Sequence, residues 1–357
     1  MRHKIFLLHA YAAGNSGDRL LVECSIEIAK QFSTEPVTVV CIDKYSFLHQ
    51  NHNLPARYIS IPQFFLELLK TRMAGVSPIF FGVGGGYLRF TSVKEGIKTF
   101  LAHSSQLLLS LAIHPTSKFI YLPQSVGPFT GVLGKITKLL LKRIDILFVR
   151  DEKSLKEITS SSNVVRCPDL VVRKIFTSIA SHDYRRTKAS DSLGSDVGFI
   201  FRDLPASKSY SYRAKISTLF DTTPNAKLLI QSKGRGNNDE ALYCEMFPGK
   251  PIIERQDFER NGSGVIVSVR LHGSLEAILA GVPSVHLAYE RKGLSAFSDL
   301  GIGQFAFHVR DFDPPSVQRA CETIRLTPNA YWSKIEDKAK TFTDNIPPLI
   351  TKIIEAK

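Results

Sequence analysis

Short apolar runs alternate with longer stretches of helical periodicity along most of this 357-residue chain. A run of about four to eight apolar residues is typical of a buried strand, and apolar residues recurring at every third or fourth position predict a helix. In the first half this pattern predicts strands at 4–9, 37–42, 78–83, 118–122, 144–149 and 164–167. The helices predicted between them cover 18–32, 61–72, 93–113, 131–143 and 151–159. Such alternation predicts a parallel sheet with helices on both faces.

The second half repeats the alternation after a polar interruption. Its predicted strands are 197–201, 226–231, 265–269 and 284–287, and its predicted helices lie near 213–220, 240–247, 275–279, 316–325 and 332–354. Residues 177–195 lack apolar periodicity, which predicts a linker. We therefore expect two α/β domains, 1–176 and 196–357, facing a cleft, with the terminal helix packing back on the first domain. Many sugar-handling transferases have this architecture.

The segment 265–292 carries the densest set of candidate functional residues. Its first strand is followed directly by Arg270 and His272, and its second strand is followed by Tyr289 and Lys292. The carboxyl ends of parallel strands are where α/β proteins bind their ligands. The candidate binding residues in this segment, besides that pair, are Gly273, Ser274, Tyr289 and Lys292.

These residue types suit a small anionic ligand and proton transfer. Arg270 can hold a carboxylate or phosphate with two parallel hydrogen bonds, which a lysine cannot do. The pKa of an ordinary histidine lets His272 exchange protons near neutral pH. Backbone N–H groups at Gly273 and Ser274, at a helix start, would add an anion site. The alternative is that Arg270 pairs with an acid and His272 only caps the helix.

The first half has a glycine-rich turn after its first predicted strand. Residues 14–18 read Gly-Asn-Ser-Gly-Asp and open a helix, so Asp18 is either a helix cap or a catalytic candidate. The turn matches neither the dinucleotide pattern nor the P-loop, so NAD and ATP are not indicated. A second glycine run, 84–86, is costly to order, which predicts that a ligand lies against Gly85 and Gly86 unless the run is a mobile turn.

Two more strand ends in this half carry polar candidates. Gln124 and Ser125 follow the strand 118–122 and could hydrogen-bond sugar hydroxyls, although turn chemistry also explains this segment. Arg150 follows the strand 144–149 and is a candidate for a second anion contact. Its alternative role is an ion pair with a neighbouring acid.

Charge favours anionic partners. The chain has 46 Lys and Arg against 33 Asp and Glu, a formal net charge of +13. Phosphorylated small molecules, an anionic membrane surface and nucleic acid all fit such a balance. No RNA-binding motif, zinc finger or basic repeat is present, which argues against nucleic acid. The predicted helix 131–143 could rest on anionic lipid as a peripheral contact, or it could be an ordinary surface helix; its basic residues are Lys135, Lys138, Lys142 and Arg143.

The cysteines and the apolar segments bear on location. The five cysteines have neither metal-ligand nor redox spacing, which favours a reducing cytoplasm and no metal site. Residues 1–13 resemble a signal peptide superficially, but their apolar core is too short, so we interpret them as the first strand. The apolar stretch 100–113 is too short to span a membrane. We expect a cytoplasmic protein, which would sit at the inner face of the plasma membrane only if the helix 131–143 rests on lipid.

The ordered set of motifs resembles the polysaccharide pyruvyl transferase family. Arg-Leu-His-Gly, followed by Gly-Val-Pro and Tyr-x-x-Lys, is its most specific part. The resemblance extends from the first strand to about residue 300. The matching segments are 14–18, 84–86, 122–128, 149–154, 168–169 and 268–273, with Pro283, Tyr289 and Lys292.

The resemblance implies two Rossmann-like domains of the glycosyltransferase-B type. It also implies transfer of pyruvate from phosphoenolpyruvate to two hydroxyls of one sugar, giving a cyclic ketal on a surface polysaccharide or its lipid-linked precursor, without a cofactor. On this hypothesis His272 is the general acid, Arg270 holds the donor, and Asp18 is a candidate acceptor-side base. The main alternative is a sugar-nucleotide-dependent glycosyltransferase of the same architecture.

Overall fold

A computed structural model describes residues 3–11, 15–48, 56–158, 163–181, 193–204, 209–234, 237–261 and 264–356. The chain forms two compact units. The first unit comprises Met1–Ala13, Asp18–Leu170 and Thr343–Lys357, and the second comprises Gly14–Gly17 and Val171–Phe342. The last segment of the chain therefore belongs with the first unit, and the glycine-rich turn belongs with the second.

The first unit is built on a parallel sheet in the order β3-β2-β1-β4-β6-β7-β8, with β5 also paired to β6. Its central strands are buried on both faces, as their apolar sequences predict. The strands are β1 (Ile5–Ala10), β2 (Val37–Cys41), β3 (Ala56–Ser60), β4 (Ile79–Gly82), β5 (Gly85–Phe90), β6 (Lys118–Phe129), β7 (Ile146–Val149) and β8 (Val164–Arg166).

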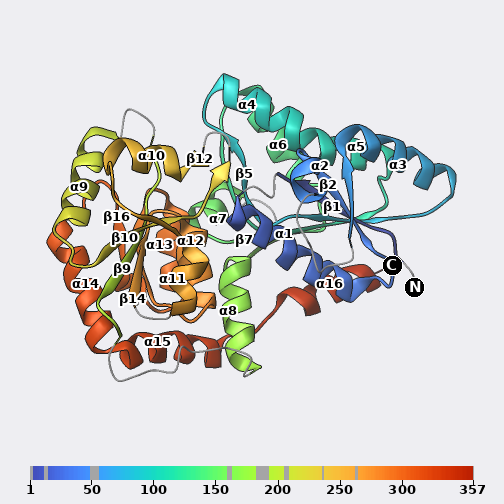
Figure 1. Ribbon diagram of the computed structural model, residues 1–357. Helices are drawn as coiled ribbons and strands as arrows, with labels where there is room; N and C mark the ends of the chain where they lie inside the picture. The colour runs from blue at the N-terminus through green and yellow to red at the C-terminus, as the bar shows by residue number, and fades with distance from the viewer. Residues whose placement is uncertain are drawn as a thin grey trace. The chain divides into compact units, whose positions relative to one another are not determined.

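Helices cover both faces of this sheet. Figure 1 shows α3 to α6 along one face, with α1 and α16 on the other. The helices are α1 (Ser16–Ala29), α2 (Lys44–Leu48), α3 (Ile61–Met73), α4 (Val93–Thr99), the π-helix η2 (Phe100–Ser104), α5 (Ser105–Ile113), α6 (Gly131–Leu141), α7 (Glu152–Ile158) and α16 (Ile346–Glu355), with a short 3-10 turn, Lys30–Phe32, after α1. Among the described residues, no helix is long and apolar enough to cross a membrane.

The second unit has its own parallel sheet, in the order β13-β10-β9-β14-β15-β16, with helices on both faces (Figure 1). Its strands are β9 (Asp196–Ile200), β10 (Ala226–Ile230), β13 (Ile252–Glu254), β14 (Gly264–Ser268), β15 (Ser284–Ala288) and β16 (Ala306–His308), beside a small β11 (Lys233–Gly234) and β12 (Asn237–Asn238) pair. Its helices are α8 (Leu170–Ala180), α9 (Ser209–Asp221), α10 (Asp239–Met246), α11 (Arg255–Asn261), α12 (Leu271–Leu279), α13 (Arg291–Asp299), α14 (Pro314–Leu326) and α15 (Pro328–Thr341).

This architecture confirms the predicted fold class of two Rossmann-like α/β units, but several elements differ from their predicted form. The helix predicted at 93–113 contains a π-helical turn, and the one predicted at 332–354 is divided between α15 and α16. The linker predicted from residue 177 begins inside α8, which continues to Ala180. The second unit begins at Val171, before the predicted boundary at 176, because α8 packs within it: the rings of Phe176 and Phe342 lie 5.0 Å apart.

Candidate functional site

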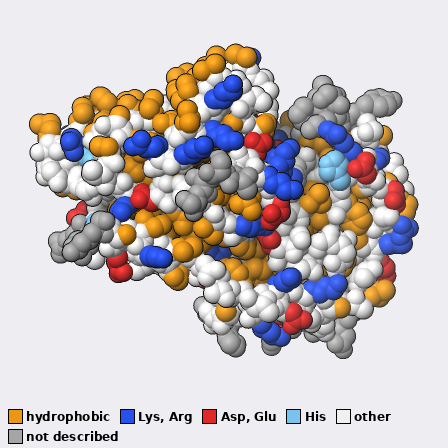
Figure 2. Space-filling model, turned by 180° about the vertical axis from the view of Figure 1, so that it is seen from behind, with side chains coloured by type: hydrophobic (Ala, Val, Ile, Leu, Met, Phe, Trp, Pro, Cys, Tyr) orange, Lys and Arg blue, Asp and Glu red, His pale blue; other side chains and the backbone are white. Residues whose placement is uncertain are grey.

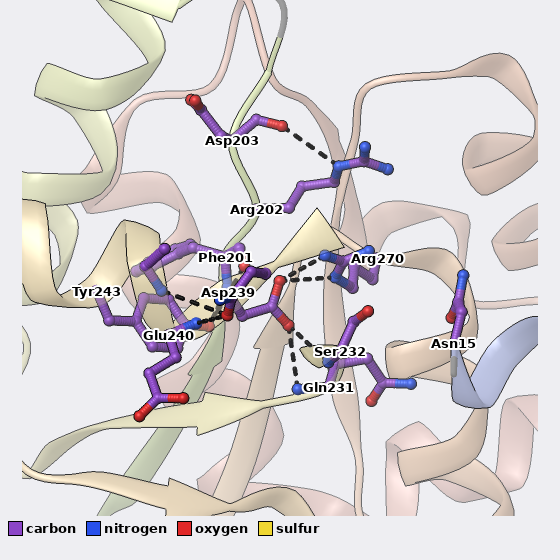
Figure 3. Close-up of polar contacts among 12 residues, drawn as sticks. Asn15, Phe201, Arg202, Asp203, Gln231, Ser232, Asp239, Glu240, Tyr243 and Arg270 are labelled. Carbon is purple, nitrogen blue, oxygen red and sulfur yellow. Dashed lines mark hydrogen bonds and ion pairs between the residues drawn. The ribbon is translucent and has the colours of Figure 1, made fainter. Parts of the chain in front are cut away.

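Polar side chains gather at the carboxyl edge of the second unit's sheet. Gln231 and Ser232 follow β10, Arg202 follows β9, Arg270 follows β14, and Tyr289 follows β15. These four strands are neighbours in the sheet, and parallel strands end at the same edge. Figure 3 shows the first four of these side chains close together. This edge is the candidate active site.

The guanidinium of Arg270 is held by the carboxylate of Asp239. Nε and Nη2 of Arg270 donate to Oδ1 of Asp239 at 3.1 and 2.5 Å, and Oδ2 accepts the backbone N–H groups of Gln231 and Ser232 at 3.1 and 2.9 Å (Figure 3). Asp239 is fully buried, and burial raises its pKa although Arg270 and the two amides oppose the shift. The pair fixes one edge of the guanidinium at the end of β14.

Helix α12 begins unusually close to the sheet because of a glycine. The hydroxyl of Ser268 accepts the backbone N–H of Arg270 at 3.1 Å and donates to its carbonyl at 2.8 Å. A Cβ on Gly273 would lie 2.8 Å from that hydroxyl oxygen, which is closer than real Cβ atoms come. A glycine is therefore needed here for packing. Its backbone N–H lies in the first helical turn, where amides lack an intrahelical acceptor.

The glycine-rich turn of the chain's beginning packs against this same helix. Asn15 forms a β-bridge with Ser232, and the hydroxyl of Ser16 donates to Glu276 at 3.0 Å. A Cβ on Gly17 would lie 2.5 Å from Cβ and 2.7 Å from Nδ1 of His272. The His272 side chain is half-buried and lies directly against this glycine. The turn therefore limits where the imidazole can be.

A buried charge network lies behind Glu276. Its carboxylate accepts from Gln231 at 3.2 Å and pairs with Arg255, which also pairs with Glu259 at 2.6 Å. Burial raises the pKa of Glu259 to about 7, an effect that Arg255 opposes and Glu276 reinforces. The network ties α11, α12 and the glycine-rich turn together.

Tyr289 lies close to two cations. The guanidinium of Arg202 lies 4.8 Å from the centre of its ring and donates to its hydroxyl at 2.7 Å. The ammonium of Lys292 lies 6.0 Å from the same ring and pairs with Glu290 at 2.9 Å. The two arginines, Arg202 and Arg270, line one cavity of about 210 Å³. Asp203, Asp239 and Glu245 line the same cavity, so this edge presents both cations and carboxylates.

Ser274 does not have the free amide that the sequence predicts. Its N–H donates to the carbonyl of Arg270 at 3.1 Å, the first hydrogen bond of α12. Its hydroxyl is fully buried, 3.2 Å from Nδ1 of His286. Burial lowers the pKa of His286 to about 4. Ser274 thus joins the helix to β15, and the predicted anion site is reduced to the amides before it.

The candidates in the first unit form a buried network of their own. Arg150 is 3% exposed, donates to Ser125 at 3.0 Å and pairs with Asp169, which is the alternative role considered for it above. Gln124 is fully buried and donates to the hydroxyl of Tyr87 at 2.7 Å. These side chains make internal contacts, and their role as substrate ligands stays a prediction.

The remaining candidates of the first unit are Gly85, Gly86 and Asp18. Gly85 begins strand β5, with a φ of 159°, and a Cβ on Gly86 would lie 3.2 Å from Nη2 of Arg150. The side chain of Arg150 therefore lies close to the glycine run, and a ligand at Gly85 and Gly86 stays a prediction. Asp18 lies in the first turn of α1 and is partly buried. Among the described residues, no group of three or more His, Cys, Asp or Glu could hold a metal ion.

Sequence reasoning missed Arg202, Asp239 and Glu276. Arg202 could have been found, because it follows a predicted strand just as Arg270 does. Asp239 has no comparable signal, since it stands at the start of a helix 31 positions from its partner. Glu276 lies inside the apolar pattern of α12, where a lone acid gives no hint of its partners.

Solved structures share the fold of the whole chain. A glycosyltransferase from Rickettsia africae aligns over 100% of both chains with a TM-score of 0.59 and 11% identity. The UDP-GlcNAc 2-epimerase from Methanocaldococcus jannaschii aligns over 91% of this chain and 93% of its own with a TM-score of 0.53 and 14% identity. The UDP-GlcNAc 2-epimerase from Neisseria meningitidis, bound to UDP-GlcNAc, aligns over 99% of both chains with a TM-score of 0.54 and 12% identity. At these identities the similarity concerns the fold.

Sequence comparison identifies the family. A search of curated proteins found no match. The family model for polysaccharide pyruvyl transferase matches residues 15–291, which include the glycine-rich turn, Arg270, His272 and Tyr289. Because this match covers most of the chain, the protein belongs to the polysaccharide pyruvyl transferase family.

Proposed function

We propose that this protein transfers pyruvate from phosphoenolpyruvate to two hydroxyl groups of one sugar, forming a cyclic ketal and releasing phosphate. The observation that carries the proposal is the position of Arg270 and His272 together at the carboxyl edge of the second unit's sheet, in a chain of this family. The acceptor would be a sugar of a surface or exopolysaccharide, either free or as its lipid-linked precursor.

Phosphoenolpyruvate has a carboxylate and a phosphate, so its site needs several positive groups. Arg270 and Lys292 would bind these anions, with the first backbone N–H groups of α12, including that of Gly273, as further donors. Asp239 orients Arg270 for this task, since it binds one edge of the guanidinium. Tyr289 would position Lys292 beside the donor.

His272 would act as general acid toward the methylene carbon of the donor. The electron pair of the carbon–carbon double bond takes this proton and forms a methyl group, which leaves the neighbouring carbon electrophilic. One sugar hydroxyl adds to that carbon, phosphate leaves with the electrons of its carbon–oxygen bond, and the second hydroxyl closes the ring. The acceptor loses two protons; these balance the one on the new methyl group and the one on the released phosphate. Asp18 is the proposed acceptor-side base.

Phosphate release tests the proposal directly. Purified protein, phosphoenolpyruvate and candidate saccharides should yield phosphate together with an acceptor heavier by one pyruvate ketal in mass spectrometry. His272→Asn should reduce this turnover at least a hundredfold while the protein unfolds at the wild-type urea midpoint. Near-normal turnover by a folded His272→Asn would rule out its assignment as the acid.

The second candidate is a sugar-nucleotide-dependent glycosyltransferase. It is favoured by the shared fold with a glycosyltransferase and with UDP-GlcNAc epimerases. The same assay separates the two, because a glycosyltransferase would release a nucleotide from a sugar nucleotide and leave phosphoenolpyruvate intact. Nucleotide release without phosphate release would replace the proposed function by this one.

A further inference from the structure

One face of the first unit presents apolar and basic side chains to solvent together. Helices α3, α4, α5 and α6 lie on this face, where α3 packs on α5 and α4 packs on α6. Together with the π-helix between α4 and α5, these helices carry ten of the fifteen exposed large apolar side chains among the described residues. Figure 2 shows such side chains along the upper left edge, with Lys and Arg among them. We call this surface the basic apolar face.

The exposed apolar residues of α3 form one stripe. Phe65, Leu66, Leu69 and Met73 are 41%, 56%, 39% and 89% exposed, and their spacing places them within about one third of the helix circumference. The opposite side of the same helix holds its buried residues, among them Phe64 and Leu68. The helix therefore has apolar residues on both its inner and outer sides.

The neighbouring helices continue this stripe. Val93, Ile97 and Leu101, spaced four residues apart on α4 and the π-helix, are 82%, 46% and 65% exposed. On α6, Val132 and Leu139 are 74% and 62% exposed. An apolar surface spread over several helices is larger than the single exposed apolar residues that every soluble protein has.

Cations surround these apolar side chains. Between residues 61 and 143 the sequence has ten Lys and Arg but only two acids, Glu67 and Glu95. Glu67 is 8% exposed and already paired with Lys4, so it contributes little negative charge to the surface. The exposed cations of the face are Lys70, Arg72, Lys94, Lys98, Lys135, Lys142 and Arg143. All of these but Lys70 lack an ion pair among the described residues.

We infer that the basic apolar face docks this protein on an anionic lipid membrane. Aliphatic side chains that enter the headgroup region, together with unpaired Lys and Arg around them, are the combination by which peripheral proteins bind such surfaces. The charge argues against a second copy of the chain as the occupant, because two identical basic faces would repel each other. The surface extends the basic helix predicted from the sequence to three neighbouring helices.

Vesicle flotation tests the inference on the full chain. Wild-type protein should float with phosphatidylcholine vesicles that contain roughly 30% of the anionic lipid phosphatidylglycerol, which gives the vesicle a negative surface potential. It should not float with vesicles of pure phosphatidylcholine. Flotation should fall at high salt, because screening weakens the electrostatic attraction. A wild-type protein that ignores anionic vesicles at low salt would overturn the inference.

Two variants of the face separate its charged and apolar parts. Lys94→Gln, Lys98→Gln, Lys135→Gln and Lys142→Gln combined should lower the partition coefficient at least tenfold. Combining Met73→Ser, Leu101→Ser and Val132→Ser should lower it to a similar degree, because these exposed side chains would enter the lipid. Replacing exposed residues leaves the core intact, so both variants should keep the wild-type unfolding midpoint.

Control variants remove four exposed lysines or two exposed leucines from the second unit. Lys250, Lys334, Lys338 and Lys340 changed to Gln, or Leu294 and Leu326 changed to Ser, should leave flotation within twofold of wild type. Equal losses from the control and face variants would show that net charge or general hydrophobicity is responsible, and would overturn the assignment of this surface. Self-association of the wild type that the apolar variant abolishes, without flotation, would assign the face to a second copy instead.

Discussion

Asp239 and Gly17 show how the surroundings of two side chains determine what those side chains can do. The carboxylate of Asp239 uses one oxygen for Arg270 and the other for two backbone amides, so the guanidinium has a fixed orientation. Gly17 has no side chain, and for this reason the ring of His272 can lie against the turn. At both positions a residue without direct chemistry positions one that we propose to have it.

Gly17→Ala should therefore impair catalysis. The new Cβ would overlap Cβ and Nδ1 of His272, so the imidazole or the turn must move. We expect kcat for phosphate release to fall at least tenfold and the free energy of unfolding to fall by about 1–3 kcal/mol. Steady-state kinetics and urea denaturation measure the two effects.

The matched control is Gly303→Ala, in the same unit. A Cβ there would have no neighbour closer than 3.7 Å, so turnover and stability should stay at wild-type values. Wild-type kcat in Gly17→Ala would show that the turn does not position His272.

At the scale of elements, two helices of the first unit each contain a glycine, and the two glycines have opposite roles. Gly134 in α6 lies against the backbone of the preceding strand: its Cβ would be 2.7 Å from the carbonyl carbon of Phe129. Gly96 in α4 has room, with its nearest neighbour, a Phe90 ring carbon, at 3.4 Å. The first glycine allows a close helix approach, and the second only weakens its helix.

The same substitution should accordingly have opposite effects at these sites. Gly96→Ala should raise the free energy of unfolding by about 0.5–1 kcal/mol, because alanine has the higher helix propensity. Gly134→Ala should lower it by about 1–3 kcal/mol through overpacking. Urea denaturation of both variants checks the pair, and each serves as the control for the other. A stabilised Gly134→Ala would contradict the close approach described for α6.

The elements also show where sequence reasoning succeeds. The regular alternation of apolar runs and helical patterns was sufficient to predict most strands of both sheets, because burial on both faces makes a parallel strand continuously apolar. Strand β3 escaped prediction, since Arg57 and Tyr58 interrupt its apolar pattern at a sheet edge. Strand β5 was missed because its two glycines suggest a turn.

The sequence predicts which candidate residues follow a strand, but it does not predict which side chains they contact. The glycine run 84–86 has the side chains of Leu170 and Arg150 close to its backbone, which the sequence could not predict. Arg150 and Arg270 look alike in sequence, because both directly follow a strand. Both are buried and paired with an aspartate, Arg150 with Asp169 and Arg270 with Asp239, but Arg270 also lines a cavity. Only the folded chain distinguishes these environments.

At the scale of the molecule, the core of the first unit encloses His9 and His103, whose pKa is lowered, and that of the second unit encloses His286. Burial lowers the pKa of His103 in the first unit and of His286 in the second to about 4, and it lowers the pKa of His9 as well. These rings are neutral in the folded protein, and they take up protons near pH 6.5 once the chain unfolds. Glu259 has the opposite effect, because its pKa is raised to about 7 by burial.

Acid should therefore destabilise the protein well before its carboxylates titrate fully. As the pH falls from 6.5 toward 4, these histidines become protonated in the unfolded chain but stay neutral in the folded protein. This difference lowers the free energy of unfolding by about 3 kcal/mol for each of His103 and His286. Glu259 offsets part of this loss between pH 7 and 4.5, because its protonated form is favoured in the folded state. Urea midpoints measured from pH 7.5 to 4.5 should fall steadily in the wild type.

This fall in the urea midpoint should be smaller in His103→Gln, which lacks one of the buried imidazole rings, and steeper in Glu259→Gln, which lacks the offset. Equal slopes in all three proteins would mean that these buried groups do not control the acid stability.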